Sequence, residues 1–289
     1  MSFSGGDFTI RGGASDANVG DKRGYIEELS LKSRIPFVRL LDATGGSVKT
    51  FEQIGRTYLP GNSTGGGRVD EMLNTVPVAS AVLGSVAGLP AVQACLCHFN
   101  VMVKNTSQVF VAGPKVVEQA TGRSISKEEL GDERIQVKNG VIMNLADSEE
   151  DAMDQVKQFL SYMPQSVYQL PPKVECKDDP ERREEKLLSI VPKNRRQIYD
   201  PLEIVSAVLD QDSFFEIAPF YGKARITGLA RVDGFPVGVM ANNPKYNGGS
   251  MDIALSLIHI SEPTRLGMRS YAVFWLKKKG GGGGGGGGG

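Results

Sequence analysis

The chain has 289 residues, of which 40% are hydrophobic, and its 33 basic side chains balance 33 acidic ones. Because residues 255–289 hold five Lys or Arg and one Glu, residues 1–254 have 28 basic and 32 acidic side chains, too acidic a body for general nucleic-acid binding. Cys95, Cys97 and Cys176 are too few and too irregularly spaced for a disulfide framework or a zinc site, so we expect reduced, buried thiols.

The first half of the chain alternates apolar extended runs with amphipathic helical patterns. The start, MSFSGGDFTIRGG, is neither a secretory signal nor an Arg-rich presequence, and no apolar run reaches the roughly 20 residues that span a membrane. We predict a helix over residues 21–33. Extended runs are predicted at residues 7–13, 36–46, 76–85, 101–105 and 109–114. Strands that alternate with helices predict an α/β layered domain with its sites at strand-to-helix turns.

Two helix starts are predicted by capping patterns. Ser126 and Glu129 have the spacing of a capping box. The clearest helix begins at Ser148 and carries apolar residues on one face from Ala152 to Met163.

The texture changes after this helix. Residues 164–197 are rich in Pro and charge, which is typical of a linker. A helix at 201–209, a strand at 213–217 and a hairpin around Asp233-Gly234 follow, so a second domain begins near residue 198. About 55 residues are too few for it to stand alone. The predicted organisation is one domain at 1–163, a linker at 164–197 and the start of another domain at 198–254.

The last segment, residues 255–289, matches no periodicity found upstream and ends in ten glycines. Ten consecutive glycines lose much backbone entropy on ordering and offer no side chain to bury. The stretch LSLIHISEPTR resembles a translated sequencing adapter, and the Lys-Gly end resembles translated poly-A and poly-G. We therefore expect an artefactual, disordered tail, to be left out of fold reasoning.

Familiar catalytic side-chain motifs and His/Cys ligand clusters are missing from the sequence, so no metal site is predicted. Attention falls instead on GSVAGLP, residues 84–90, where a strand meets a helix that opens with Pro90. The amides of Gly88 and Leu89 are predicted to be free at the positive end of this helix, as an oxyanion site. An ordinary tight strand–helix connection is the alternative.

A second glycine turn, DATGGSVK, follows the extended run at 36–46. Gly45, Gly46 and Ser47 could cradle a phosphate or a thioester, with Lys49 as a nearby cation. A common Gly-Gly turn is the alternative.

The stretch from Gly84 to Gly131 resembles the carboxyltransferase (β) subunits of biotin-dependent acyl-CoA carboxylases, especially the propionyl-CoA carboxylase type. The family pattern has a Gly-x-x-Ala-Gly-Gly turn, then Met-Val-Lys-Asp-Thr-Ser, then Gly-Pro-x-Val-Val; this chain has AGLP, MVKNTS and GPKVV in that order. Residues 179–244 are similar to the family's interdomain segment and second domain, so the resemblance covers residues 6–254.

The resemblance implies a crotonase-like fold (the ClpP/crotonase fold), with one nearly complete domain and the start of a second. It implies carboxyl transfer from carboxybiotin to the α-carbon of a short acyl-CoA, through an enolate held by backbone amides. On this basis Gly88 and Leu89 are the predicted oxyanion donors. The predicted substrate-binding residues are Ala87, Gly45, Gly46, Ser47 and Lys49.

The partners implied are a biotin carboxylase and biotin carrier α subunit, acyl-CoA, and further copies in a hexamer, with neither nucleic acid nor membrane. The resemblance favours the mitochondrial matrix, with the cytoplasm as the alternative. A chain that holds the acyl-CoA half-site and little of the biotin half-site is expected to be inactive alone. Two other functions stay open: a stand-alone crotonase-type hydratase, isomerase or decarboxylase, and a non-catalytic CoA-binding protein.

The sequence departs from the family pattern at several places. Leu89 replaces the second glycine of the oxyanion turn, Pro90 lacks an N–H, and His98 stands where the family has Asp. The side chain of Leu89 is therefore expected to limit the size of the acyl group, and His98 is read as a packed, hydrogen-bonded residue.

Overall fold

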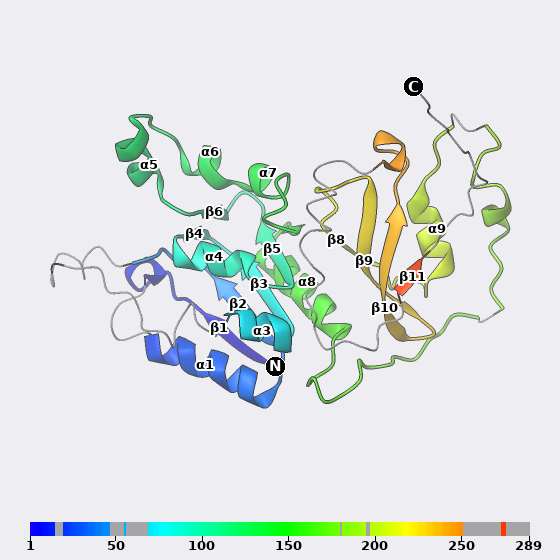
Figure 1. Cartoon of the computed structure of the whole chain (residues 1–289), viewed down its shortest axis with the longest axis horizontal. Helices are drawn as coiled ribbons and strands as arrows, with labels where there is room; N and C mark the ends of the chain where they lie inside the picture. Colours follow the sequence, from blue (N-terminus) through cyan, green and yellow to red (C-terminus); the bar gives the residue numbers. More distant parts are fainter. Residues whose placement is uncertain are drawn as a thin grey trace, which may run out of the picture.

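The structure, a computed structural model, describes residues 1–14, 20–46, 55, 69–179, 181–194, 197–250 and 273–275. Figure 1 shows two bodies of secondary structure side by side. One is built on a parallel sheet with helices α1 to α8, and the other on an antiparallel hairpin with helix α9.

The first body is organised by a five-stranded parallel sheet in the order β1-β2-β3-β5-β7. Every neighbouring pair in it is parallel. Its strands are β1 (Ser2–Gly5), β2 (Phe37–Leu41), β3 (Val78–Val82), β5 (Phe99–Val103) and β7 (Asn144–Ala146). All residues of β3 and β5 are buried, as expected of central parallel strands that are covered on both faces.

A second, two-stranded parallel sheet pairs β4 (Ser85–Ala87) with β6 (Gln108–Phe110). The helices of this body are α1 (Gly20–Ser33), α3 (Val69–Thr75), α4 (Leu89–Cys95), α5 (Pro114–Thr121), α6 (Lys127–Gly131), α7 (Glu133–Gln136) and α8 (Glu149–Ser161). A 3-10 turn, η1 (Arg11–Gly13), follows β1.

Both predicted helix starts are confirmed. Ser126 and Glu129 form the reciprocal bonds of a capping box at α6, and Ser148 caps α8 by accepting a hydrogen bond from the amide of Asp151. The buried face of α8 packs on β3, β5 and β7. The helix predicted at 21–33 is confirmed as α1.

The strand expected at residues 7–13 is wrong. The first strand lies upstream at Ser2–Gly5 and pairs with β2, whereas residues 8–13 form turns and η1. Gly12 and Gly13 both have φ of 66°, a left-handed conformation that ends an extended run. Ile10, which made the stretch look like a strand, is exposed.

The second body contains η2 (Glu185–Leu188), α9 (Pro201–Val208), β8 (Phe215–Ile217), β9 (Arg225–Val232), β10 (Phe235–Asn242) and η3 (Asn247–Gly249). Asp233 and Gly234 join β9 to β10 with φ of 50° and 75°, which confirms the predicted hairpin. Within the segment expected to be a disordered tail, β11 (Val273–Trp275) pairs with β10 in parallel. The other residues of 255–289 lie outside the described ranges.

The two bodies share an aromatic cluster. The ring of Phe99 on β5 stacks on Phe159 of α8 at 5.1 Å and meets Phe215 of β8 edge-on at 5.3 Å, all three side chains being buried. Tyr162 donates its hydroxyl to the carbonyl of Ser213 at 2.7 Å. The second body therefore completes the core of the first one instead of standing apart from it.

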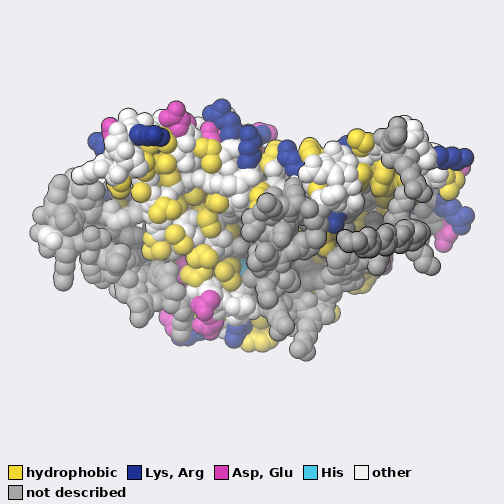
Figure 2. Space-filling model, turned by 45° about the horizontal axis from the view of Figure 1, so that its top comes forward, with side chains coloured by type: hydrophobic (Ala, Val, Ile, Leu, Met, Phe, Trp, Pro, Cys, Tyr) yellow, Lys and Arg dark blue, Asp and Glu magenta, His cyan; other side chains and the backbone are white. Residues whose placement is uncertain are grey.

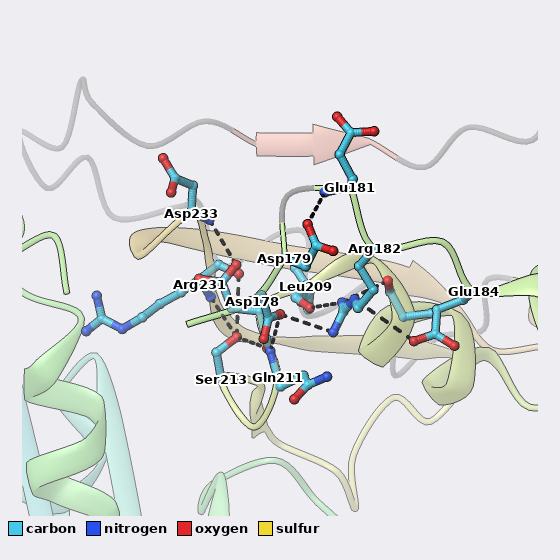
Figure 3. Close-up of polar contacts among 12 residues, drawn as sticks. Asp178, Asp179, Glu181, Arg182, Glu184, Leu209, Gln211, Ser213, Arg231 and Asp233 are labelled. Atoms are coloured by element: carbon cyan, nitrogen blue, oxygen red, sulfur yellow. Dashed lines mark hydrogen bonds and ion pairs between the residues drawn. The ribbon is translucent and has the colours of Figure 1, made fainter. Parts of the chain in front are cut away.

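Two arginines fasten the segment that joins the bodies, and Figure 3 shows the polar contacts around them. Arg182 donates to the carbonyls of Ala207 and Leu209 at the end of α9 and pairs with Asp178. Arg231 donates to the carbonyl of Ser161 at 2.8 Å, which ties β9 to the end of α8.

Among the described residues, no helix is both long and apolar enough to cross a membrane.

Candidate active site

The two glycine turns predicted from the sequence meet in the structure. Gly88 precedes α4 with φ of 68° and ψ of −131°, a conformation that side-chain-bearing residues rarely adopt. A Cβ built on Gly88 would lie 3.5 Å from the Cα of Gly45, and one built on Gly45 would lie 3.4 Å from the carbonyl oxygen of Ala87. The backbones of the turn after β2 and of the turn before α4 are therefore in contact.

We call the contact between these two turns the joint. Not all of its amides are available to bind a ligand. The N–H of Gly88 donates to the carbonyl of Phe110 at 3.2 Å, which extends the β4–β6 pairing by one bond. The expectation of a free Gly88 amide is therefore wrong in this conformation. Among the described residues, no acceptor is found for the N–H of Leu89, and Pro90 has none to give. Of the two predicted donors, only the Leu89 amide is thus without an acceptor among the described residues.

The remaining predicted residues are divided between the joint and the residues left undescribed. Ala87 belongs to the joint, and its amide donates to the carbonyl of Ala43 at 3.2 Å. Gly46 is exposed and follows Gly45 directly. Ser47 and Lys49 lie outside the described residues.

An open cavity of about 460 Å³ lies against η1 and the end of β1. Its lining includes the rings of Phe3 and Tyr25, the side chain of Ile10, and the cations Arg11 and Lys22. Figure 1 places its elements, β1 and α1, along one edge of the first body. The sequence analysis missed this cavity; its signal would have been the exposed apolar side chains of a segment that was read as a strand.

The cavity is joined to the glycine turns through η1. The amide and the hydroxyl of Thr44 both donate to the carbonyl of Gly12, at 2.9 and 3.0 Å. A Cβ on Gly13 would approach the carbonyl oxygen of Asp42 to 2.7 Å, so only glycine allows this close packing. One wall of the cavity and the turn that carries Gly45 therefore form one unit.

Asp42 begins the same turn, and the sequence analysis did not identify it. Partial burial, and then the negative charge of Glu149, raise the pKa of the Asp42 carboxyl. A Cβ on Gly84 would overlap this carboxyl, so the carboxyl lies directly against the β3–β4 turn. Such a group holds a proton more readily than an ordinary Asp.

Exposed apolar side chains lie on α4 and in the segment that follows β6. Leu89 and Val92 of α4 are partly exposed, and Val111 and Val116 beyond β6 are 79% and 59% exposed. Figure 2 shows hydrophobic side chains gathered over the part of the molecule that carries α4. Cys95, at the end of α4, is also exposed, which corrects the expectation of buried thiols. No group of three or more His, Cys, Asp or Glu that could hold a metal ion occurs among the described residues.

The sequence matches a family model described as the carboxyl transferase domain over residues 3–257. The propionyl-CoA carboxylase carboxyltransferase subunit of Haloferax mediterranei is 34% identical over 251 residues, which cover 86% of this chain and 48% of that protein. The methylmalonyl-CoA decarboxylase subunit alpha of Veillonella parvula is 32% identical over 255 residues, again 86% of this chain and 48% of that protein.

A solved structure of the transcarboxylase 12S hexamer, with hydrolysed methylmalonyl-coenzyme A bound, superimposes with a TM-score of 0.76 and 26% identity. The superposition covers 86% of this chain and 49% of that one. The chain therefore spans about half the length of each of these three proteins.

Proposed function

We start from the fact that this chain belongs to the carboxyl transferase family, and we propose that it forms the acyl-CoA half of a biotin-dependent carboxyltransferase. Its fold is the crotonase-like fold predicted from the sequence. The reaction proposed is transfer of a carboxyl group from carboxybiotin, brought by a partner protein, to the α-carbon of a short acyl-CoA. The donor would supply both the carboxyl group and a ureido nitrogen able to accept the α-proton.

The observation that carries this proposal is the contact between Gly45 and Gly88, together with a cavity of rings and cations that is connected to it through η1. Carboxyl transfer to a thioester needs little from side chains, because the α-carbon reacts as an enolate whose charge lies on the thioester oxygen. We assign the Leu89 amide as one donor to that oxygen. Loss of one such donor typically raises a barrier by about 3–4 kcal/mol.

Gly88 remains the proposed second donor, although its N–H already has an acceptor. Its N–H is held by the carbonyl of Phe110 at 3.2 Å, so it can serve the oxygen only by sharing that hydrogen or by a shift of the turn. Gly45 and Gly46 line the other side of the joint, and Ala87 precedes it. We propose that the thioester lies between these two turns.

The cavity is proposed to hold the nucleotide end of coenzyme A. Tyr25 and Phe3 offer flat apolar surfaces for a purine, and Lys22 and Arg11 offer charge for its phosphates. Among the described residues, Asp7 is the one acidic residue that lines it. A ligand with both a ring and several phosphates suits this lining better than a purely apolar one.

Titration calorimetry of the chain with propionyl-CoA tests the assignment. Lys22→Gln should weaken binding several-fold because it removes a phosphate partner. Lys32→Gln is the matched control, since Lys32 lies on the same helix α1 but pairs with Glu28 at 2.7 Å and is absent from the lining. Equal losses in both variants would contradict the location of the site.

A second direction of the same reaction is favoured by one relative, the methylmalonyl-CoA decarboxylase subunit alpha. An enolate-stabilising site serves removal of a carboxyl group as well as its addition. Decarboxylation of methylmalonyl-CoA in the presence of a biotin acceptor, compared with carboxylation of propionyl-CoA, distinguishes the two directions.

A stand-alone hydratase or isomerase would need a positioned acid or base, and Asp42, with its raised pKa, is the described group that could serve. Turnover of an enoyl-CoA without any biotin partner, abolished by Asp42→Asn, would favour that function. Carboxylation that survives Asp42→Asn would favour the carboxyltransferase.

We also propose that the apolar face of Leu89, Val92, Val111 and Val116 is covered in the assembled enzyme by another subunit. A biotin-carrying α subunit and a homo-oligomer are the partners proposed. Light scattering of the chain, alone and with Val111→Glu, measures whether this face carries self-association.

A further inference from the structure

Arg39 is a buried charged residue on an inner strand of the parallel sheet. It lies on β2, is 1% exposed, and has its guanidinium carbon 5.2 Å from the centre of the Phe37 ring. A buried charge is costly unless it is paired and hydrogen-bonded. Its contacts therefore say what it is there to hold.

The guanidinium holds the end of helix α4. One terminal nitrogen, Nη1, donates to the carbonyl of Leu96 at 2.8 Å and reaches the carbonyl of Gln93 at 3.4 Å. Leu96 is the C-cap residue of α4. Carbonyls at a helix C-terminus lack partners within the helix, and a cation there also complements the helix dipole.

The other terminal nitrogen faces α1. Nη2 lies 3.5 Å from a carboxylate oxygen of Glu27, whose side chain is 12% exposed. Glu27 follows Tyr25 and Ile26, which line the large cavity. Arg39 thus contacts both the helix that follows Gly88 and the helix that forms a wall of the cavity.

Arg39 is also on the strand that leads into Gly45. A small cavity of about 20 Å³ lies next to Arg39. Its lining includes Glu27, Arg39, Ala43, Pro90 and Gln93. The side chain of Arg39 therefore lies close both to the strand end that leads to Gly45 and to α1, which forms a wall of the large cavity.

We infer that Arg39 is a positioning residue for the acyl-CoA site, which fixes α4 and the Gly88–Leu89 turn relative to α1. The inference rests on the proposed function. Its consequence is specific: loss of Arg39 should harm the binding of an enolate-like anion at the turn more than the binding of coenzyme A in the cavity.

The test compares two probes on the purified chain by calorimetry. One is free coenzyme A, and the other is a coenzyme A derivative whose acyl group is replaced by a nitronate, an anionic mimic of a thioester enolate. Arg39→Met should weaken the nitronate derivative about tenfold and change the affinity for coenzyme A less than twofold. Arg39→Lys should recover part of the loss, because an ammonium can reach the Leu96 carbonyl but cannot fork between α4 and α1.

Arg182→Met is the matched control. Arg182 donates to the carbonyls of Ala207 and Leu209 at the end of α9, so it has the same kind of contact in the other body. This variant should lower the melting temperature and leave the ratio of the two affinities unchanged. An unchanged ratio in folded Arg39→Met, or an equal change in Arg182→Met, would overturn the inference.

Two further results keep the outcomes separate. If Arg39→Met does not fold, Glu27→Gln removes the ion pair to α1 but keeps the bonds from Arg39 to α4. It should then change the ratio of the two affinities in the same direction as Arg39→Lys, and an unchanged ratio contradicts the inference. If the unaltered chain binds neither probe, the proposed function itself fails.

Discussion

The amide of Gly88 donates to the carbonyl of Phe110, so the turn before α4 is part of the β4–β6 sheet and not a free loop. The consequence is a rigid turn: one side is held by a backbone hydrogen bond, and the other rests on Gly45. Such a turn sets the position of the Leu89 amide before a ligand arrives, whereas the Gly88 amide must share or give up its bond to Phe110.

Gly88→Ala should therefore weaken ligand binding strongly at a modest cost in stability. The φ of 68° strains any side chain, at roughly 1–3 kcal/mol, and relief of that strain moves the turn away from Gly45. We expect at least a tenfold loss of affinity for propionyl-CoA in calorimetry.

Gly122→Ala controls for backbone strain alone. Gly122 ends α5 with φ of 72° and has no atom within 4 Å of a built Cβ. It should lose a similar free energy of unfolding and keep its affinity. A Gly88→Ala variant that binds as tightly as Gly122→Ala would remove the turn from the site.

The sequence was sufficient for those features that depend on local chemistry. The caps at Ser126 and Ser148 and the Asp233-Gly234 hairpin each follow from a few neighbouring residues. The strand prediction for residues 7–13 was wrong because it used only the local alternation of apolar and polar residues. Which segment pairs with β2 is decided by residues far away in the sequence.

The site was foreseen in pieces only. Both glycine turns were predicted, because each follows an apolar run and glycine lets the backbone turn sharply there. Their contact, the bond from Gly88 to Phe110 and the cavity beside η1 depend on how three separate segments pack. No spacing within a single segment carries that information.

His98 predicts a loss of stability in mild acid. Its Nδ1 accepts a hydrogen bond from the amide of Val78 at 3.0 Å and its Nε2 lies 2.9 Å from the carbonyl of Leu73, so the folded ring is neutral. Burial lowers the pKa of His98 below its ordinary value of 6.5. The folded chain then binds fewer protons than the unfolded one, and stability falls as pH drops below about 6.5.

Urea unfolding between pH 7.5 and 5 measures this effect. The free energy of unfolding should fall by at most about 1.4 kcal/mol per pH unit on account of this group. In His98→Gln, whose amide can make both bonds without titrating, that part of the slope should vanish. A variant with the same pH slope as the unaltered chain would show that another group is responsible.

Glu216 predicts the opposite dependence. Burial raises the pKa of this carboxyl on β8 above its ordinary value of 4.5. The folded state thus favours the protonated form, and ionisation destabilises it as the pH rises through and above 4.5. Glu216→Gln should accordingly be more stable than the unaltered chain at pH 7, with a smaller gain at pH 4.

Glu181→Gln is the control for a general change of charge, because the side chain of Glu181 is 83% exposed. It should shift the free energy of unfolding by less than about 0.5 kcal/mol at either pH. If both variants gained equally at pH 7, net charge would explain the result and burial would not.

Asn144 decides whether the two bodies unfold together. It is buried on the edge strand β7, donates to the carbonyl of Glu216 at 3.0 Å, and accepts from the amide of Ala218 at 3.0 Å. Ala218 has φ of 56°, an unusual value for Ala, which this bond helps to hold. Asn144→Ala leaves two backbone groups without their partner, at about 1–3 kcal/mol each.

The loss of stability should appear first where Asn144 of β7 contacts β8, between the two bodies. Hydrogen exchange of the β8 amides should accelerate at least tenfold in Asn144→Ala, while the β3 amides, further inside the sheet, change less. Asn144→Asp is the matched variant, because it keeps an acceptor for the amide of Ala218 and loses the donor to the carbonyl of Glu216. Its exchange rates should lie between those of the unaltered chain and those of Asn144→Ala. If β8 and β3 accelerate equally, the bodies form one cooperative unit, and the shared Phe99–Phe159–Phe215 cluster outweighs this polar joint.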